Sequence, residues 1–168
     1  MKAVATILAV AASIALQTTL ARYVRGMVAL DFVLVVVVYV ALMSGPVTGL
    51  LTGTFGGLIQ DALSTGVIGI GGLAKTLVGF LAGIVGTQFI VAQPLPRFFV
   101  FFGATVVHQV VFIGLYTLLD LRHFGAPYAA VAGQAAGNAA VGVVAFQLAE
   151  LLPGAVERRR AAKGRLRR

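Results

Sequence analysis

The sequence contains no cysteine, and only 11% of its 168 residues are charged. The absence of cysteine excludes disulfides, thiolate metal sites and cysteine nucleophiles together. Soluble proteins carry about 25% charged residues, whereas 60% of this chain is hydrophobic and its mean hydropathy is +1.01. A chain this short has too little interior to bury that much apolar surface. The composition therefore indicates a protein whose surface faces lipid.

Catalytic patterns are also missing. The sequence has no HExxH metal motif, no GxGxxG or Walker phosphate loop, no evident Ser-His-Asp set and no close pair of carboxylates. We therefore expect a protein that is not an enzyme and that has no cofactor and no metal site. An ATP-driven function would need another subunit.

Long uncharged stretches predict an all-α, polytopic integral membrane bundle. A membrane-spanning helix needs about 17–25 apolar residues, whereas barrel strands would alternate apolar and polar residues, which residues 33–38 do not. Ser44-Gly45-Pro46 interrupts the longest stretch, because proline lacks a backbone donor. The six expected spans are residues 3–21, 27–43, 47–65, 68–91, 98–119 and 128–152. The alternative has five spans, with residues 32–60 as one kinked span.

Positive charge gathers at the C-terminus. We expect a helical domain over residues 1–156 and a basic tail over residues 157–168, and the Lys/Arg bias places both termini in the cytoplasm. The first span is expected to be retained rather than cleaved as a signal peptide. The tail is expected to contact anionic lipid or an acidic partner, or only to set the topology, and no nucleic-acid partner is expected. Its basic residues are Arg158, Arg159, Arg160, Lys163, Arg165, Arg167 and Arg168.

Glycines recur every four residues in two consecutive spans. Small residues at this spacing share one helix face and let two helices approach closely. We expect this face to pack within the protein, the alternative being a face for a partner. The glycines concerned are Gly45, Gly49, Gly53, Gly57, Gly79 and Gly83.

Asp61 and Lys75 continue these two glycine faces at the ends that a short turn joins. An unpaired charge inside a membrane is costly, so we expect the two to form an ion pair. Separate solvation at the interface is the alternative, and a proton or ion relay is less favoured. Glu150 is expected to pair with the basic tail.

Several uncharged polar residues lie within other spans. Such groups commonly form hydrogen bonds between helices, and the alternative is a polar pocket for a small ligand. They are Gln17, Thr18 and Thr19 in the first span, Thr105, His108 and Gln109 in the fifth, and Gln134 and Asn138 in the sixth.

Residues 30–83 resemble the MreD family of rod-shape-determining proteins. An acidic residue precedes a long aliphatic run at Asp31-Phe32, and a glycine-rich helix ends in an aspartate at residues 56–63. Glycines follow at Gly66 and Gly69, then a helix over residues 73–83. Leu30 stands where the family commonly has proline.

The resemblance implies a small, non-catalytic scaffold of the bacterial inner membrane. It would maintain rod shape and support peptidoglycan synthesis by binding an MreC-like membrane protein. The wider complex would contain the MreB filament, the RodA glycosyltransferase and its penicillin-binding transpeptidase, and the family implies no catalytic residues.

The same family is similar in architecture to the six-helix substrate-binding subunits of energy-coupling-factor vitamin transporters, which gives an alternative function. Such subunits dock through small residues of the first helix, here Ala5, Ala9, Ala11, Ala12 and Ala15. A channel or carrier is a third alternative.

If the glycine faces pack internally, a partner helix needs another surface. We expect it on the aliphatic run of the second span or the aromatic run of the fifth. The candidate residues are Val33, Val35, Val38, Phe98, Phe99 and Phe102.

Overall fold

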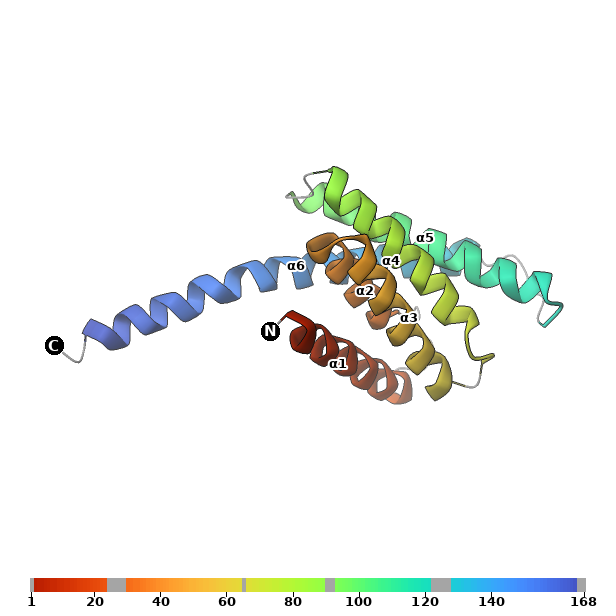
Figure 1. Ribbon diagram of the computed structural model, residues 1–168, viewed down its shortest axis with the longest axis horizontal. Helices are drawn as coiled ribbons and strands as arrows, with labels where there is room; N and C mark the ends of the chain where they lie inside the picture. The colour runs from red at the N-terminus through yellow and green to blue at the C-terminus, as the bar shows by residue number, and fades with distance from the viewer. Residues whose placement is uncertain (1, 24–29, 65, 90–92, 122–127, 166–168) are drawn as a thin grey trace.

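The computed structural model describes residues 2–23, 30–64, 66–89, 93–121 and 128–165, and their side chains over residues 3–20, 30–64, 66–89, 93–121 and 128–151. Within these ranges the secondary structure consists of six α-helices (Figure 1). The expected all-α architecture is confirmed. The helices are α1 (Lys2–Tyr23), α2 (Phe32–Ser44), α3 (Pro46–Leu63), α4 (Ile70–Gln88), α5 (Pro94–Leu118) and α6 (Tyr128–Arg165).

The chain reverses direction between α2 and α3. Gly45 adopts a φ of +87°, which favours glycine, and Pro46 lies in the first turn of α3, where a missing N–H is tolerated. A Cβ added to Gly56 would lie 3.2 Å from Val33, near the opposite end of α2. The two helices therefore form an antiparallel hairpin, and residues 32–60 are not one kinked span.

The hairpin places α2 at the centre of the bundle, where it contacts each of the other five helices. Apolar side chains cover the whole circumference of α2, which is typical of a buried helix. Its residues Leu34 and Val38 join Val78 of α4, Phe101 of α5 and Phe146 of α6 in the hydrophobic core.

Four helices are long and apolar enough to cross a membrane, namely α1, α4, α5 and the first 24 residues of α6. The 13 residues of α2 measure about 20 Å, which is less than the hydrocarbon thickness of about 30 Å. Glycines, threonines, Gln60 and Asp61 make α3 more polar than the four candidate spans. Helix length and composition thus support four of the six expected spans.

Candidate functional site

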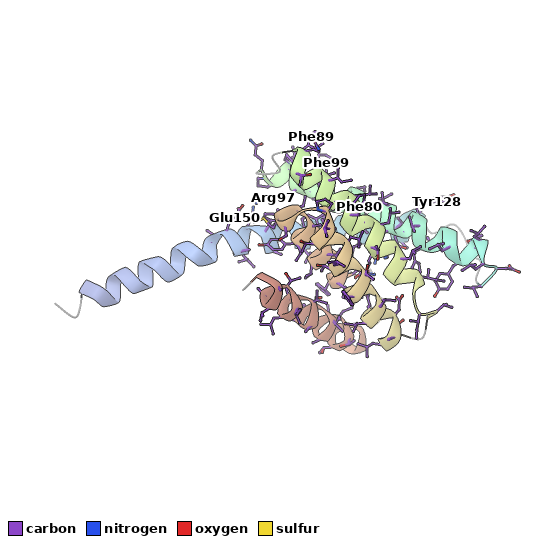
Figure 2. The ribbon with its side chains drawn as sticks, viewed as in Figure 1. Phe80, Phe89, Arg97, Phe99, Tyr128 and Glu150 are labelled. Atoms are coloured by element: carbon purple, nitrogen blue, oxygen red, sulfur yellow. The ribbon has the colours of Figure 1, made fainter. Side chains whose placement is uncertain are left out.

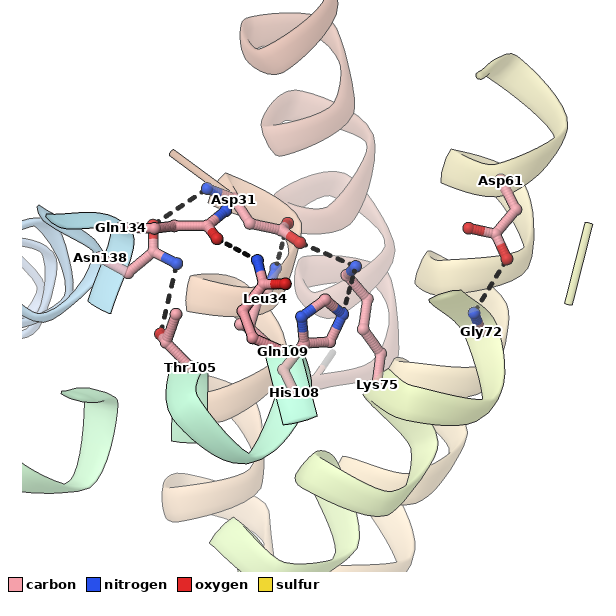
Figure 3. Close-up of polar contacts among 10 residues, drawn as sticks. All are labelled: Asp31, Leu34, Asp61, Gly72, Lys75, Thr105, His108, Gln109, Gln134 and Asn138. Atoms are coloured by element: carbon pink, nitrogen blue, oxygen red, sulfur yellow. Dashed lines mark hydrogen bonds and ion pairs between the residues drawn. The ribbon is translucent and has the colours of Figure 1, made fainter. Parts of the chain in front are cut away.

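A buried polar centre lies among α2, α4, α5 and α6 (Figure 3). Lipid offers no hydrogen-bond partners, so polar groups inside a membrane bundle must find partners within the protein. The five residues that form this polar centre come from distant parts of the chain, and each is exposed by 5% or less. They are Asp31, Lys75, Thr105, His108 and Asn138.

Asp31 fixes the start of α2 against two other helices. Its Oδ1 accepts a hydrogen bond of 2.9 Å from the backbone N–H of Leu34, which caps α2. Its Oδ2 lies 2.7 Å from Nζ of Lys75 on α4. Its backbone N–H donates to Oδ1 of Asn138 on α6 at 2.9 Å.

Lys75 also contacts α5, because its Nζ lies 3.2 Å from Nε2 of His108. An ammonium group can only donate, so Nε2 of His108 accepts and the ring proton lies on Nδ1. That Nδ1 has no hydrogen-bond partner among the described residues. With His108 neutral, the charges of Asp31 and Lys75 cancel and leave the polar centre without net charge.

Amide side chains extend the polar centre between α5 and α6. Nδ2 of Asn138 donates to Oγ1 of Thr105 at 3.3 Å, and Nε2 of Gln109 donates to Oε1 of Gln134. These contacts are the interhelical hydrogen bonds expected from the sequence. Thr105 lies near the middle of the 25 residues of α5, so the capped start of α2 lies near the middle of a helix that is long and apolar enough to cross a membrane.

The expected ion pair between Asp61 and Lys75 is not formed. Oδ2 of Asp61 instead accepts hydrogen bonds from the backbone N–H groups of Gly69 and Gly72, at 2.9 and 3.0 Å. The partial positive charge of a helix N-terminus stabilises a carboxylate, so Asp61 caps α4 and needs no cation. Proximity in the sequence favoured the wrong carboxylate for Lys75. The sequence did contain a signal for Asp31. An acidic residue directly before an apolar run is typical of the start of a helix.

The glycines expected to pack line the contact between α3 and α4, which we call the glycine seam. A Cβ added to Gly57 would lie 2.6 Å from Cα of Gly72, and one added to Gly53 would lie 2.6 Å from the carbonyl carbon of Lys75. Gly49 and Gly79 face each other's backbone in the same way, and Gly83 faces Pro46 and Gly45. The backbones touch, so these glycine positions have no room for a side chain.

The aliphatic part of the expected partner surface is buried. Val33, Val35 and Val38 are exposed by 5% or less, because α2 is enclosed by the other helices. Phe98 and Phe102 are partly buried against the core and stack on each other with ring centroids 6.1 Å apart. Phe99 is 64% exposed on α5 and remains available to a partner.

Arg97 joins α5 to α6 at the end where α6 leaves the bundle (Figure 2). Its Nη1 donates to Oε2 of Glu150 at 3.0 Å, and its guanidinium lies 4.1 Å from the ring centroid of Phe146. Glu150 pairs with Arg97, and its expected pairing with the basic tail involves side chains outside the described residues. The side chains of the tail, including Arg158, lie outside the described residues, as do Arg167 and Arg168 altogether.

A cavity of about 1260 Å³ is lined by residues of α1, α2, α3 and the end of α4. Its walls include Ile7, Val10 and Ile14 of α1 and Thr52 and Phe55 of α3. Of the alanines expected to dock an energising subunit, Ala11 and Ala15 face this cavity. No residue of the polar centre lines it.

Among the described residues, no cluster of His, Cys, Asp or Glu side chains could hold a metal ion. A family model described as rod shape-determining protein MreD matches residues 1–148 of the chain. No curated protein and no solved structure matches. The likeness to transporter subunits therefore stays a prediction.

Proposed function

Because this chain belongs to the rod shape-determining protein MreD family, we propose that it is a non-catalytic scaffold of the bacterial inner membrane that supports peptidoglycan synthesis during cell elongation. The match over residues 1–148 is the observation that carries the proposal. It covers every described helix except the C-terminal part of α6. The scaffold acts by binding an MreC-like membrane protein, and through it the MreB filament, RodA and the penicillin-binding transpeptidase.

The distribution of helices supports a role within the membrane. Short connections join the six helices, and only α6 continues for many residues beyond an apolar span. A protein of this shape contacts its partners through lipid-facing helix surfaces and through its tail. An MreC-like partner therefore packs its membrane helix against an exposed face of the bundle.

The face that we propose for this contact lies on α5 around Phe99. A shallow apolar groove of about 220 Å³ runs between α4 and α5, with Phe99, Gly103 and Val107 on its α5 side. A Cβ added to Gly103 would meet no atom within 4 Å, so a partner helix could approach closely there. The buried valines of α2 play no part in this contact.

The proposed topology has six spans with both termini in the cytoplasm. The α2–α3 hairpin supplies the second and third spans, and the capped start of the short α2 lies against the polar centre. A reporter that is active only outside the cytoplasm should be active when fused after Asp120 and inactive after Arg168. The opposite pattern at either site would refute this topology.

Depletion and copurification test the function itself. Depleting the protein from a rod-shaped host should give round cells, and the protein should copurify with an MreC-like partner. Phe99→Ala should reduce partner recovery, whereas Leu118→Ala, at a position 80% exposed near the end of α5, should not. Depleted cells that keep their shape would refute the proposed function, and cells that then need an external vitamin would indicate a transporter subunit.

A further inference from the structure

The large cavity beside α1 has walls that suit hydrocarbon. Its volume of about 1260 Å³ exceeds the range of about 300–1,000 Å³ that is usual for small-ligand sites. Among the described residues that line it there is no Lys, Arg, Asp, Glu or His. The hydroxyl groups of Thr52 and Thr87 donate to backbone carbonyls of their own helices. A ligand of this cavity is therefore held by apolar contact.

Helix α1 makes little contact with the rest of the protein. Only 11% of its candidate span is buried, the lowest share among the four candidate spans, whereas 50% of α4 is buried. Ile7 of α1 and Phe55 of α3 both line the cavity, and both are largely exposed. Unfilled space beside such side chains forfeits dispersion contacts, and water does not fill apolar cavities. An apolar ligand would supply these contacts.

The length of the cavity matches one leaflet of a bilayer. It extends along α1 from Ala3 to Ala15, which is about 18 Å at 1.5 Å per residue. Helix α3 runs in the same direction as α1 (Figure 1) and lines the cavity from Thr48 to Ile59, about 17 Å. Half of the hydrocarbon thickness is about 15 Å, whereas a spanning partner helix needs about 30 Å. The length favours a lipid chain over a partner helix.

The two ends of the cavity differ in polarity. Ser44, Thr48 and Thr87 line it where α2 ends and α3 begins, beside the first residues of α1, whereas Ile14 and Ile59 line the other end. A helix that crosses the membrane begins at one of its surfaces, so the hydroxyl-bearing end faces that surface. A phospholipid has the same polarity, with its headgroup at the surface and its acyl chains directed inward.

We propose that this cavity binds an acyl chain of a membrane phospholipid. The headgroup lies at the end formed by Ser44 and Thr48, and the chain extends between α1 and α3 toward Ile14 and Ile59. The bound chain supplies apolar contacts between α1 and the α2–α3 hairpin. The proposal goes beyond the proposed function, because it requires only that α1 crosses the membrane and involves no protein partner.

Photocrosslinking tests the site in the unaltered chain. The protein is placed in nanodiscs that contain phosphatidylcholine with a diazirine at the end of one acyl chain, and crosslinked residues are identified by mass spectrometry after irradiation. Ile14 and Ile59 should be labelled several-fold more strongly than Val110, which is exposed on α5 outside the cavity. Equal labelling is expected of bulk lipid alone and would overturn the proposal.

Native mass spectrometry of a matched pair of variants tests retention of the lipid. The unaltered protein, released from micelles, should keep a bound phospholipid. Ala11→Phe places a ring in the cavity and should lower the retained fraction several-fold. Ala12→Phe adds the same ring at an exposed position of α1 that does not line the cavity, and it should have little effect. Similar retention in the two variants, or none in the unaltered chain, would overturn the proposal.

Headgroup exchange and partner capture identify the occupant. Phosphatidylethanolamine and phosphatidylglycerol with the same acyl chains should be retained equally, because no charged side chain is among the described residues that line the cavity. A strong preference for phosphatidylglycerol would overturn the assignment to the acyl chain. A copurified protein that crosslinks to Ile14 and Ile59 and excludes lipid would overturn the proposal in favour of a docked helix.

The two proposals fail separately. Recovery of an MreC-like partner is measured on Ala11→Phe, Ala12→Phe and Phe99→Ala. Failure of the unaltered chain to recover a partner refutes only the proposed function, because lipid retention does not depend on it. Failure of the unaltered chain to retain lipid, with normal partner recovery, refutes only the lipid site.

Discussion

Two regions of the bundle hold their helices together in opposite ways. In the polar centre, side chains reach across from four helices and the start of α2 depends on Asp31 and Lys75. In the glycine seam, α3 and α4 touch through their backbones, and the glycine positions leave no room for a side chain. Removing a group damages the first region, and adding an atom damages the second. Helices in lipid lack a hydrophobic drive to associate. The close backbone contact of the glycine seam therefore provides van der Waals attraction, and the polar centre determines which helix ends meet.

The largest effect should come from leaving a charge unpaired in the polar centre. Asp31→Asn keeps a capping side chain but leaves Lys75 without its carboxylate, and breaking a buried ion pair in this way costs about 3–5 kcal/mol. Unfolding in mixed micelles should show this loss. Leu118→Ala, at an exposed position near the end of α5, should change the unfolding free energy little. Equal losses in the two variants would show that Asp31 has no special role.

Adding one methyl group to the glycine seam should lower the free energy of unfolding by less than the loss of the Asp31 carboxylate does. In Gly53→Ala the new Cβ would lie within 3 Å of the Lys75 carbonyl carbon and the Thr76 nitrogen, and such overpacking costs about 1–3 kcal/mol. Gly103→Ala is the matched control, because its Cβ would meet open space. The same unfolding assay should separate the two variants, and equal stabilities would contradict the close α3–α4 contact.

Removing the carboxylate of Asp61 should destabilise the bundle less than removing that of Asp31. Asp61→Ala removes the cap of α4, and loss of a helix cap costs about 1 kcal/mol. Its effect should be local, so amide exchange at Gly69 and Gly72 should accelerate. Exchange that accelerates equally at the start of α2 would show that Asp61 belongs to the polar centre after all.

The smallest effect should follow loss of the Gln109–Gln134 contact. Hydrogen bonds between membrane helices contribute about 0.6 kcal/mol on average, so Gln109→Leu should destabilise by about that amount. In a chain that already carries Gln134→Leu, Gln109→Leu should cost little, because the amide that Gln109 contacts is gone. A double variant that loses the sum of two independent effects would show that the two amides do not interact.

The sequence was sufficient for features that depend on local chemistry. Gly45-Pro46 predicted the break between α2 and α3, since proline and glycine constrain the backbone wherever they occur. The four-residue glycine spacing predicted which faces meet, since the period of a helix alone determines it. The interhelical role of Asn138 and Thr105 followed from the scarcity of polar partners in lipid.

The sequence does not show which residues far apart in the chain pair or pack together. Both Asp31 and Asp61 could neutralise Lys75, and the sequence does not show that a helix N-terminus already satisfies Asp61. A uniformly apolar helix can face lipid or lie inside a bundle. The valines of α2 were assigned to a partner for that reason, and the surrounding helices bury them.

A double-mutant cycle on Lys75 tests the central claim about the bundle most directly. Lys75→Met is combined with Asp31→Asn in one cycle and with Asp61→Asn in another, and unfolding free energies are measured in the same micelles. The structure predicts a coupling of about 1–3 kcal/mol with Asp31 and less than about 0.5 kcal/mol with Asp61. A larger coupling with Asp61 than with Asp31 would contradict the polar centre described above.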